Sequence, residues 1–492
     1  MMQLNQRLRS LAILSNHWLL AAFLVLFSGG LPAAPVSGRA ADFQVSDDLA
    51  EQCIRIAPFP GAAYSDRDIT KENFYCGLDL RKLALCPKIW STSPGTILYE
   101  IDTAAYSGDY RQFEREYCSK GFHAAEAALS EPAIFKVSIN ARDTSATYAP
   151  ASWVYYHLSR YFQMGIHVPV AVYRSMEARA HNERVTTPAL EIISDRHGLG
   201  MLKAGWRLLN AIETGEASGS AANAVLTDDG RQIFGVLLNI EGDRYGPEVN
   251  GTRESGWGAG QNNDFQQTAP FLALRSELPV EEAARKAIHD ARRNPKMAKA
   301  LKADTPVEQV VFWMKDVLEI TLLDFILGQQ DRIGNIDFNW RWYWIDDGSL
   351  RFSDAPASTP PESLAGFNPL RLRQSALNDN DAGVRSGYAD FAAKTHMLEN
   401  LRHYNPGLYQ RLGQLAADFE AKGEAYRWLS ERAGLSSKES ETIARRTVEA
   451  FKLLQADCTS GQLKLDLEPI QMLMSPDNDA TGTVGSCTIS TP

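Results

Sequence analysis

The stretch Leu322-Leu323-Asp324-Phe325-Ile326-Leu327-Gly328-Gln329-Gln330-Asp331-Arg332-Ile333-Gly334-Asn335 does most to decide the fold. Its apolar residues predict the end of a buried helix, and Gly328 is the residue type at which helices commonly stop. A polar loop with Asp331 and Asn335 follows, before an aromatic strand at 338–345. An Asp and an Asn on one such loop can orient a hydroxyl and hold a divalent cation, the pairing that phosphoryl-transfer sites use.

The regions on either side of this loop differ in character. Residues 131–267 carry strand and hairpin patterns, among them an apolar strand at 133–139, and end in a long loop at 241–267 rich in Gly, Asn and Asp. Residues 268–458 carry mostly helical patterns. The sequence therefore predicts an α+β protein with a β-containing first lobe and a helical second lobe.

Two helices of the second lobe have sequences typical of a helix start. Thr305-Pro306-Val307-Glu308 offers a capping residue, a proline at the first helical position and a glutamate that can reach back. Ser436 with Glu439 predicts a second capped helix, expected to run to about Leu454.

The loop at 328–335 resembles the catalytic loop of the atypical kinases. That group includes the secretory-pathway kinases such as four-jointed and the Golgi casein kinases, the bacterial HipA kinases and the phosphatidylinositol kinases. Their loops have the pattern Gly-x-x-Asp-Arg-His with an Asn or an acid further on, and Gly328-Gln329-Gln330-Asp331-Arg332 fits it. Phe135-Lys136-Val137 is similar to the strand whose lysine pairs with nucleotide phosphates, and residues 155–174 are similar to the helix and strand that come next. The resemblance covers about residues 130–420 in order.

This resemblance implies a two-lobed protein-kinase-like fold. Residues 131–267 would form a mixed β N-lobe and residues 268–458 a mainly helical C-lobe. The implied activity is transfer of phosphate from ATP, or another nucleotide, to a hydroxyl of a protein, a sugar or a lipid. Asp331 would orient the acceptor hydroxyl as base, Lys136 would hold nucleotide phosphates, and Asn335 would bind Mg²⁺ or Mn²⁺.

A second carboxylate ligand for that metal has several candidates. Asp379 and Asp381 rank first, because they lie in an acid-dense segment that follows an alternating, strand-like stretch. Asp354 ranks second, since it ends a short strand at 349–353. Asp346 ranks third, because the Asp-Gly pair after it is typical of a hairpin turn that would lie far from the loop.

The chain departs from the atypical kinases at three points. Ile333 stands where those families have a histidine, and Asn335 lies four residues beyond Asp331 where their metal ligand lies five beyond. Residues 144–176 contain no acid that could pair with Lys136. The alternatives are therefore a catalytically inactive pseudokinase, a binding or scaffold protein of the cell envelope, or a structural envelope protein unrelated to kinases.

The N-terminal residues 1–41 have the order typical of a signal peptide. Arg7 and Arg9 precede an apolar run at 18–27, and a Gly-Gly-Leu-Pro break and small residues follow. The apolar run is too short to span a bilayer as a stable helix, so no transmembrane span is expected after cleavage. The sequence predicts an exported protein, periplasmic or extracellular, or in the secretory lumen of a eukaryote.

The cysteines are grouped at the two ends of the chain. Four lie in a cysteine-bearing extension at 42–130, one near the end of the helical region and one in a C-terminal tail at 459–492: Cys53, Cys76, Cys86, Cys118, Cys458 and Cys487. An even number in an exported protein predicts disulfides, with fifteen connectivities open. Disulfides are therefore expected to cross-link both ends, while a hydrophobic core holds the middle.

The net charge excludes one class of partner. The chain carries a formal charge of −10, and removal of residues 1–41 takes away three arginines and no acid, which leaves −13. Such an acidic chain repels phosphate backbones, so a nucleic-acid partner is not expected.

Overall fold

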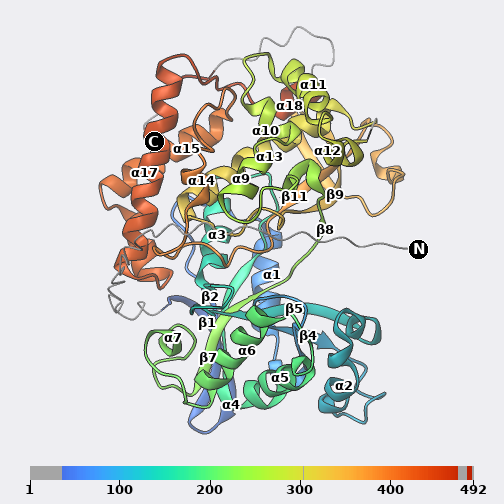
Figure 1. Ribbon diagram of the computed structural model, residues 1–492, viewed down its shortest axis with the longest axis vertical. Helices are drawn as coiled ribbons and strands as arrows, with labels where there is room; N and C mark the ends of the chain where they lie inside the picture. The colour runs from blue at the N-terminus through green and yellow to red at the C-terminus, as the bar shows by residue number, and fades with distance from the viewer. Residues whose placement is uncertain (1–35, 303, 475–484, 490–492) are drawn as a thin grey trace, which may run out of the picture. The chain divides into compact units, whose positions relative to one another are not determined.

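The computed structural model describes residues 36–302, 304–474 and 485–489. Most of the expected signal segment, residues 1–35, lies outside the described residues. The described chain is an α+β protein with a seven-stranded antiparallel sheet, a second small sheet and many helices (Figure 1). It also contains three disulfides. Within these residues, none of the helices has the length and apolar character needed to cross a membrane.

The large sheet is antiparallel throughout, which corrects the mixed sheet expected from the sequence. Its order is β1-β2-β6-β7-β5-β4-β3, so two neighbouring pairs, β2–β6 and β7–β5, are not consecutive in the chain. The strands are β1 (Gly38–Ser46), β2 (Leu49–Ile56), β3 (Ala84–Pro87), β4 (Gly95–Glu100), β5 (Ser130–Val137), β6 (Ala171–Glu177) and β7 (Gln232–Leu238). The second sheet has the order β10-β9-β11, with β8 also paired to β9: β8 (Asp243–Arg244), β9 (Asp337–Asp346), β10 (Ser349–Asp354) and β11 (Leu370–Ala376).

The segment expected to form an N-terminal extension is part of the large sheet. It contributes β2, β3, β4 and most of β1. Residues 38–41, which the sequence assigned to the signal segment, pair with Cys53–Ile56 as the start of β1. Two of the four cysteines of this segment lie on its strands, Cys53 on β2 and Cys86 on β3.

Helices make up most of the remainder. They are α1 (Asp66–Gly77), α2 (Tyr110–Tyr117), α3 (Pro150–Tyr161), α4 (Ala178–His181), α5 (Thr187–Ile193), α6 (Gly200–Glu213), α7 (Ser220–Asn223), α8 (Pro247–Asn250), α9 (Ala259–Phe265), α10 (Ala269–Leu274), α11 (Val280–Ala291), α12 (Pro295–Ala300), α13 (Val307–Leu327), α14 (Phe391–Lys394), α15 (Pro406–Glu420), α16 (Glu424–Arg427), α17 (Ser437–Thr459) and α18 (Pro469–Met474). The segment 241–267 was expected to be one long loop, but β8, α8 and α9 lie within it. Turns at its many glycines separate elements too short to show a periodic pattern.

The central helix α13 is buried along nearly its whole length. A helix that is apolar on all sides is stable only inside a core, which accounts for its composition. It ends at Gly328, whose left-handed backbone (φ 61°) confirms the predicted stop. The predicted cap at Thr305 is wrong, because Pro306 is the N-cap residue and no side chain caps the helix. Burial, rather than capping, stabilises this helix.

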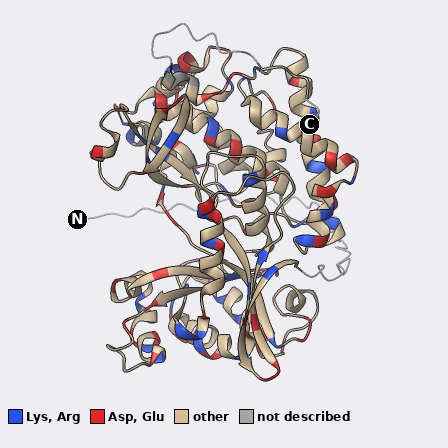
Figure 2. Cartoon of the chain, turned by 180° about the vertical axis from the view of Figure 1, so that it is seen from behind, with Lys and Arg blue, Asp and Glu red and all other residues tan. Residues whose placement is uncertain are grey.

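The second predicted cap is confirmed. The Ser436 hydroxyl and the Glu439 carboxylate form a capping box at the start of α17. Acidic and basic residues both occur along this helix (Figure 2), and Arg445 pairs with Glu449 one turn later at 3.0 Å. Such exposed pairs add only about 0.3–0.5 kcal/mol each.

Helix α3 connects the large sheet with the helical part of the chain. It packs against β6 and β7 and also against α13 (Figure 1). Trp153 and Tyr155 on this helix are fully buried, and the Tyr155 hydroxyl donates a hydrogen bond to Asp324 of α13 at 2.8 Å. One continuous hydrophobic core therefore runs from the sheet into the helices.

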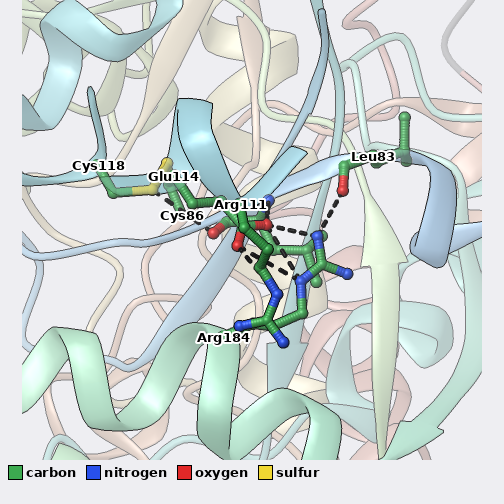
Figure 3. Close-up of a disulfide and its surroundings, with 7 residues drawn as sticks. Leu83, Cys86, Arg111, Glu114, Cys118 and Arg184 are labelled. Carbon is green, nitrogen blue, oxygen red and sulfur yellow. Dashed lines mark hydrogen bonds and ion pairs between the residues drawn. A yellow bond between two sulfur atoms is a disulfide. The ribbon is translucent and has the colours of Figure 1, made fainter. Parts of the chain in front are cut away.

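The three disulfides are Cys53–Cys76, Cys86–Cys118 and Cys458–Cys487, which confirms cross-links at both ends. Figure 3 shows the second of them, which fastens β3 to the end of α2. Beside it, Glu114 accepts a hydrogen bond from the Leu85 backbone N–H at 2.8 Å and pairs with Arg184 at 3.1 Å. Arg184 also donates to the Leu83 carbonyl at 2.7 Å. A covalent bond and a buried ion pair thus fix the position of β3.

Candidate functional site

The candidate site is centred on Lys136, which β5 places in the interior. Its side chain is only 4% exposed, and its Nζ lies 3.1 Å from Asp379 Oδ1 and 3.3 Å from Asp381 Oδ2. Both aspartates follow β11, the last strand of the second sheet. These ion pairs bring together a lysine and two acids that the sequence placed in one site although about 240 residues separate them.

The charges of this cluster stabilise one another. Burial alone would lower the pKa of Lys136, but Asp381 and Asp379 outweigh it and raise that pKa above its usual range. Burial would likewise raise the pKa of Asp379, yet Lys136 and Lys88 hold it well below its usual range. At neutral pH, Lys136 is therefore a cation and Asp379 an anion.

The loop after α13 presents Asp331 beside these acids. The Asp331 carboxylate is exposed and accepts a hydrogen bond from the Trp257 indole at 3.3 Å. Gln329 links the two segments: its side chain accepts from the Asp331 backbone N–H at 3.1 Å and donates to the Asp379 carbonyl at 3.3 Å. The predicted base and the predicted acid cluster thus lie in adjoining loops.

The surroundings make Asp331 more basic than an ordinary aspartate. Although Asp331 is exposed to solvent on one side, the protein packed around its loop partly desolvates it. This desolvation, aided by the charges of Asp379 and Asp381, raises the pKa of Asp331, and the hydrogen bond from Trp257 opposes this. A carboxylate with a raised pKa accepts a proton from a hydroxyl more readily, as general-base catalysis requires.

The Arg332 side chain lies beneath the loop at 328–335 and forms no ion pair with Asp379 or Asp381. It is buried and pairs with Asp324 of α13 at 2.9 Å, and it donates to the Asn380 side chain at 2.8 Å. The Arg of the Asp-Arg motif therefore fixes the loop at 328–335 against the segment that carries the acids.

Asn250 at the end of α8 is a residue that sequence reasoning missed. Its side-chain oxygen accepts from the backbone N–H groups of Gly334 and Ile336 at 3.0 and 3.1 Å, and its nitrogen donates to the Ile336 carbonyl at 2.9 Å. This buried amide therefore fixes the end of the loop. Its short helix, set among glycines, gives no periodic signal that could have identified it.

Asn335 is engaged by Arg244 of β8. Arg244 donates to the Asn335 side-chain oxygen at 2.6 Å, forms an ion pair with Asp337, and lies 3.6 Å from Asp379 Oδ2. The Asn335 nitrogen donates to the Asp331 carbonyl at 2.9 Å. A guanidinium thus lies between the oxygens that were expected to bind a metal.

These residues, as they lie, do not fit a divalent cation. A magnesium or manganese ion would need the Asn335 and Asp379 oxygens that face the Arg244 guanidinium. Within residues 36–302, 304–474 and 485–489, no group of three or more His, Cys, Asp and Glu side chains has an arrangement suited to a metal ion.

The other metal candidates lie elsewhere. Asp354 ends β10 opposite Arg341 of β9, with which it forms an ion pair. Arg341 lies four residues after Asp337 on β9, and Asp337 adjoins the site. Four residues span about 13 Å along a strand, so Asp354 is held away from the site. Asp346 precedes the β9–β10 turn, where positive φ angles at the next two residues (47° and 67°) confirm the predicted hairpin. The structure therefore does not bring Asp354 or Asp346 to Asp379.

A second lysine, Lys88, lies in the same site and was not identified from the sequence. Its backbone N–H donates to the Gly95 carbonyl at 2.8 Å, and Gly95 lies directly opposite Lys136 in the β4–β5 pairing. Residues in line across neighbouring strands place their side chains on the same face, so the two lysines flank a glycine that has none. Lys88 follows β3, whose position the Cys86–Cys118 disulfide fixes.

The Lys88 ammonium is half-buried, and it makes no hydrogen bond or ion pair with the part of the chain that the structure describes. Burial lowers the pKa of Lys88, and the charge of Lys136 lowers it further, while Asp379 and Asp381 act in the opposite direction. A desolvated cation without a partner is a group that an anionic ligand would stabilise. Its only sequence signal is its place between a strand and the Ser-Thr-Ser-Pro turn at 91–94.

No protein-family model matches this chain, and no curated protein shows significant similarity to it.

Proposed function

We propose that the protein is an exported, kinase-like phosphotransferase that moves a phosphate from ATP or another nucleotide to a hydroxyl group. One observation carries the proposal: Lys136 of β5 meets Asp379 and Asp381 beside the loop that presents Asp331. This is the combination of lysine, acid segment and hydroxyl-orienting aspartate that phosphoryl-transfer sites use. The resemblance to the atypical kinases supports the same reading.

The roles follow from the environment of each side chain. Lys136 and Lys88 would contact the phosphate oxygens, because charge-assisted hydrogen bonds to phosphate are strong and both ammonium groups face the acid segment. Asp331 would accept the proton of the acceptor hydroxyl. As the hydroxyl oxygen bonds to the terminal phosphorus, the bond from that phosphorus to the bridging oxygen breaks, and the nucleoside diphosphate leaves with the electron pair.

The position of Lys136 in the sheet supports this assignment. β3 and β4 precede its strand in the chain and lie beside it in the sheet, so β5 is the third strand of a β3-β4-β5 meander. In protein kinases the phosphate-binding lysine is also on the third strand, and the loop over the phosphates precedes it. Here the β3–β4 loop supplies Lys88 and the hydroxyls of Ser91, Thr92 and Ser93.

The second candidate is a nucleotide-binding pseudokinase that scaffolds a partner. Two observations favour it. Lys136 pairs with acids of the β11 segment because α3, the helix that follows its strand, contains no acid. Arg244 also engages the Asn335 oxygen that an active kinase would offer to a metal.

The place of action is part of the proposal. Three disulfides are typical of proteins that mature outside the reducing cytosol. We therefore place the protein in the periplasm, the extracellular space or a secretory lumen. The acceptor is a protein, sugar or lipid of that compartment.

The test combines binding with transfer. Thermal unfolding of the wild type, Asp331→Asn and the surface variant Arg179→Gln is followed with ATP, once with EDTA and once with manganese. ATP is expected to stabilise all three proteins. Formation of ADP and of phosphorylated product should fall about 100-fold or more in Asp331→Asn alone. A wild type that ATP does not stabilise under either condition contradicts the proposal, and stabilisation without any transfer selects the pseudokinase.

A further inference from the structure

The side chain of Arg244 occupies a distinctive place in the site. It contacts Asn335 at 2.6 Å, Asp337 and Asp379, and it also donates to the Gly334 carbonyl. These four contacts involve oxygens of the segment 334–337 and of Asp379, the oxygens that would otherwise surround a cation. β8 fixes the backbone of Arg244, because Arg244 lies opposite Asp337 in the β8–β9 pairing.

The guanidinium still has donors to offer. Its Nε is directed at Asp337 and its Nη1 at Gly334 and Asn335, while Nη2 has one neighbour, Asp379, at 3.6 Å. The side chain is 47% exposed. Its Nη2 lies on one oxygen of Asp379, and Lys136 lies on the other. An arginine presents five N–H groups in a planar fork suited to phosphate oxygens.

The neighbouring carboxylates need a positive charge at this position. Asp337 is buried, and besides Arg244 its carboxylate accepts a hydrogen bond from Asn378 at 2.7 Å. Asp379 has Lys136 on one oxygen and Arg244 on the other. Without Arg244, the Asp337 carboxylate would lose its only ion-pair partner among the described residues, and an oxygen-rich set of Asn335, Asp337 and Asp379 would be left.

We propose that Arg244 takes the place of a divalent cation, so that this site binds nucleotide phosphates without a metal. The inference rests on the proposed nucleotide-binding function and deepens it. Arg244 neutralises the oxygens of both loops and offers its Nη2 edge to the phosphates, beside the two lysines. An oxygen-rich set of this kind attracts hard cations such as Mg²⁺ and Mn²⁺ once the guanidinium is removed.

The first arm of the test needs no nucleotide. Electron paramagnetic resonance of free Mn²⁺ measures manganese binding to the wild type, Arg244→Ala, Arg244→Lys and the remote control Arg179→Ala. Arg244→Ala is expected to gain one manganese site, while the other three proteins gain none. A manganese site in the wild type, or none in Arg244→Ala, overturns the inference.

The second arm measures the effect of ATP on thermal unfolding, with EDTA and with manganese. The wild type is expected to show equal stabilisation in both buffers. Arg244→Ala should bind ATP at least tenfold more weakly in EDTA and recover its affinity with manganese. Arg244→Lys keeps the positive charge and is the second variant for the case that Arg244→Ala does not fold. It should respond to ATP as the wild type does. A wild type that needs manganese overturns this inference alone. A wild type that ATP stabilises in neither buffer overturns the proposed function, whereas the manganese arm still decides the role of Arg244.

Discussion

Replacing each of the two lysines of the site by methionine should have different effects on stability. Lys136→Met removes the cation that pairs with Asp379 and Asp381, whose side chains are 28% and 8% exposed. Breaking a buried ion pair by removing one partner costs about 3–5 kcal/mol. Because Asp379 is partly solvated and keeps Arg244 at 3.6 Å, we expect the lower end, a loss of about 3 kcal/mol in the free energy of unfolding.

Lys88→Met is the matched control. It makes the same chemical change in the same site, but Lys88 has no ion-pair partner among the described residues, and its charge is disfavoured by burial and by Lys136. Methionine retains the packing of the lysine stem. The free energy of unfolding should therefore stay the same or rise.

Urea denaturation followed by tryptophan fluorescence measures both variants. In the wild type, the lowered pKa of Asp379 contributes stability above the unfolded-state pKa of an aspartate, about 3.9, and this stability is lost as the pH falls through the folded pKa. Lys136→Met should therefore lose less stability than the wild type between pH 5 and pH 3. Equal destabilisation by the two substitutions, or a Lys136→Met protein as stable as the wild type, would refute the reasoning.

Three further predictions concern other residues. Burial raises the pKa of Asp316 from 3.8 to about 7, so its contribution to stability is present at low pH and lost as the pH rises to 7. Asp316→Asn should lack this loss, which amounts to about 3 kcal/mol between pH 4 and pH 7, in urea titrations at these two pH values. Trp257→Phe removes the hydrogen bond that lowers the pKa of Asp331, so the pH–rate profile of transfer should move to higher pH; an unchanged profile counts against Asp331 as the base. Asn250→Ala leaves buried backbone groups at the end of the loop after α13 without partners and should cost about 1–3 kcal/mol, whereas a loss below 0.5 kcal/mol would contradict its positioning role.

Features with a local signal were predictable. The stop of α13 at Gly328 and the hairpin after Asp346 follow from single residues or pairs with particular backbone preferences, and both are confirmed. The resemblance assigned Lys136 and a metal-binding carboxylate to one site. Asp379 and Asp381 ranked first for that carboxylate because their acid-dense segment follows a strand-like stretch, and both pair with Lys136 in the structure.

Features set by tertiary pairing were not predictable. Lys88 enters the site because β3 pairs with β4 and β4 with β5, a register that no local pattern encodes. Arg244 belongs to a two-residue strand inside a segment that the sequence assigned to a loop. The mixed sheet was wrong because strand direction depends on the connections, and here long helical returns join antiparallel neighbours. Thr305 failed as a cap because α13 begins at Val307, which puts Pro306 and not Thr305 at the N-cap position.

The most direct test of the account is the affinity for ATP of the wild type and Lys88→Met, measured by isothermal titration calorimetry with EDTA and with manganese. Lys88→Met is the right comparison, because it is expected to keep the fold intact while it removes an ammonium without a partner. We predict binding by the wild type and at least tenfold weaker binding by Lys88→Met at unchanged stability. No binding by the wild type, or equal affinity of the two proteins, would contradict a phosphate-binding site at Lys136 and Lys88.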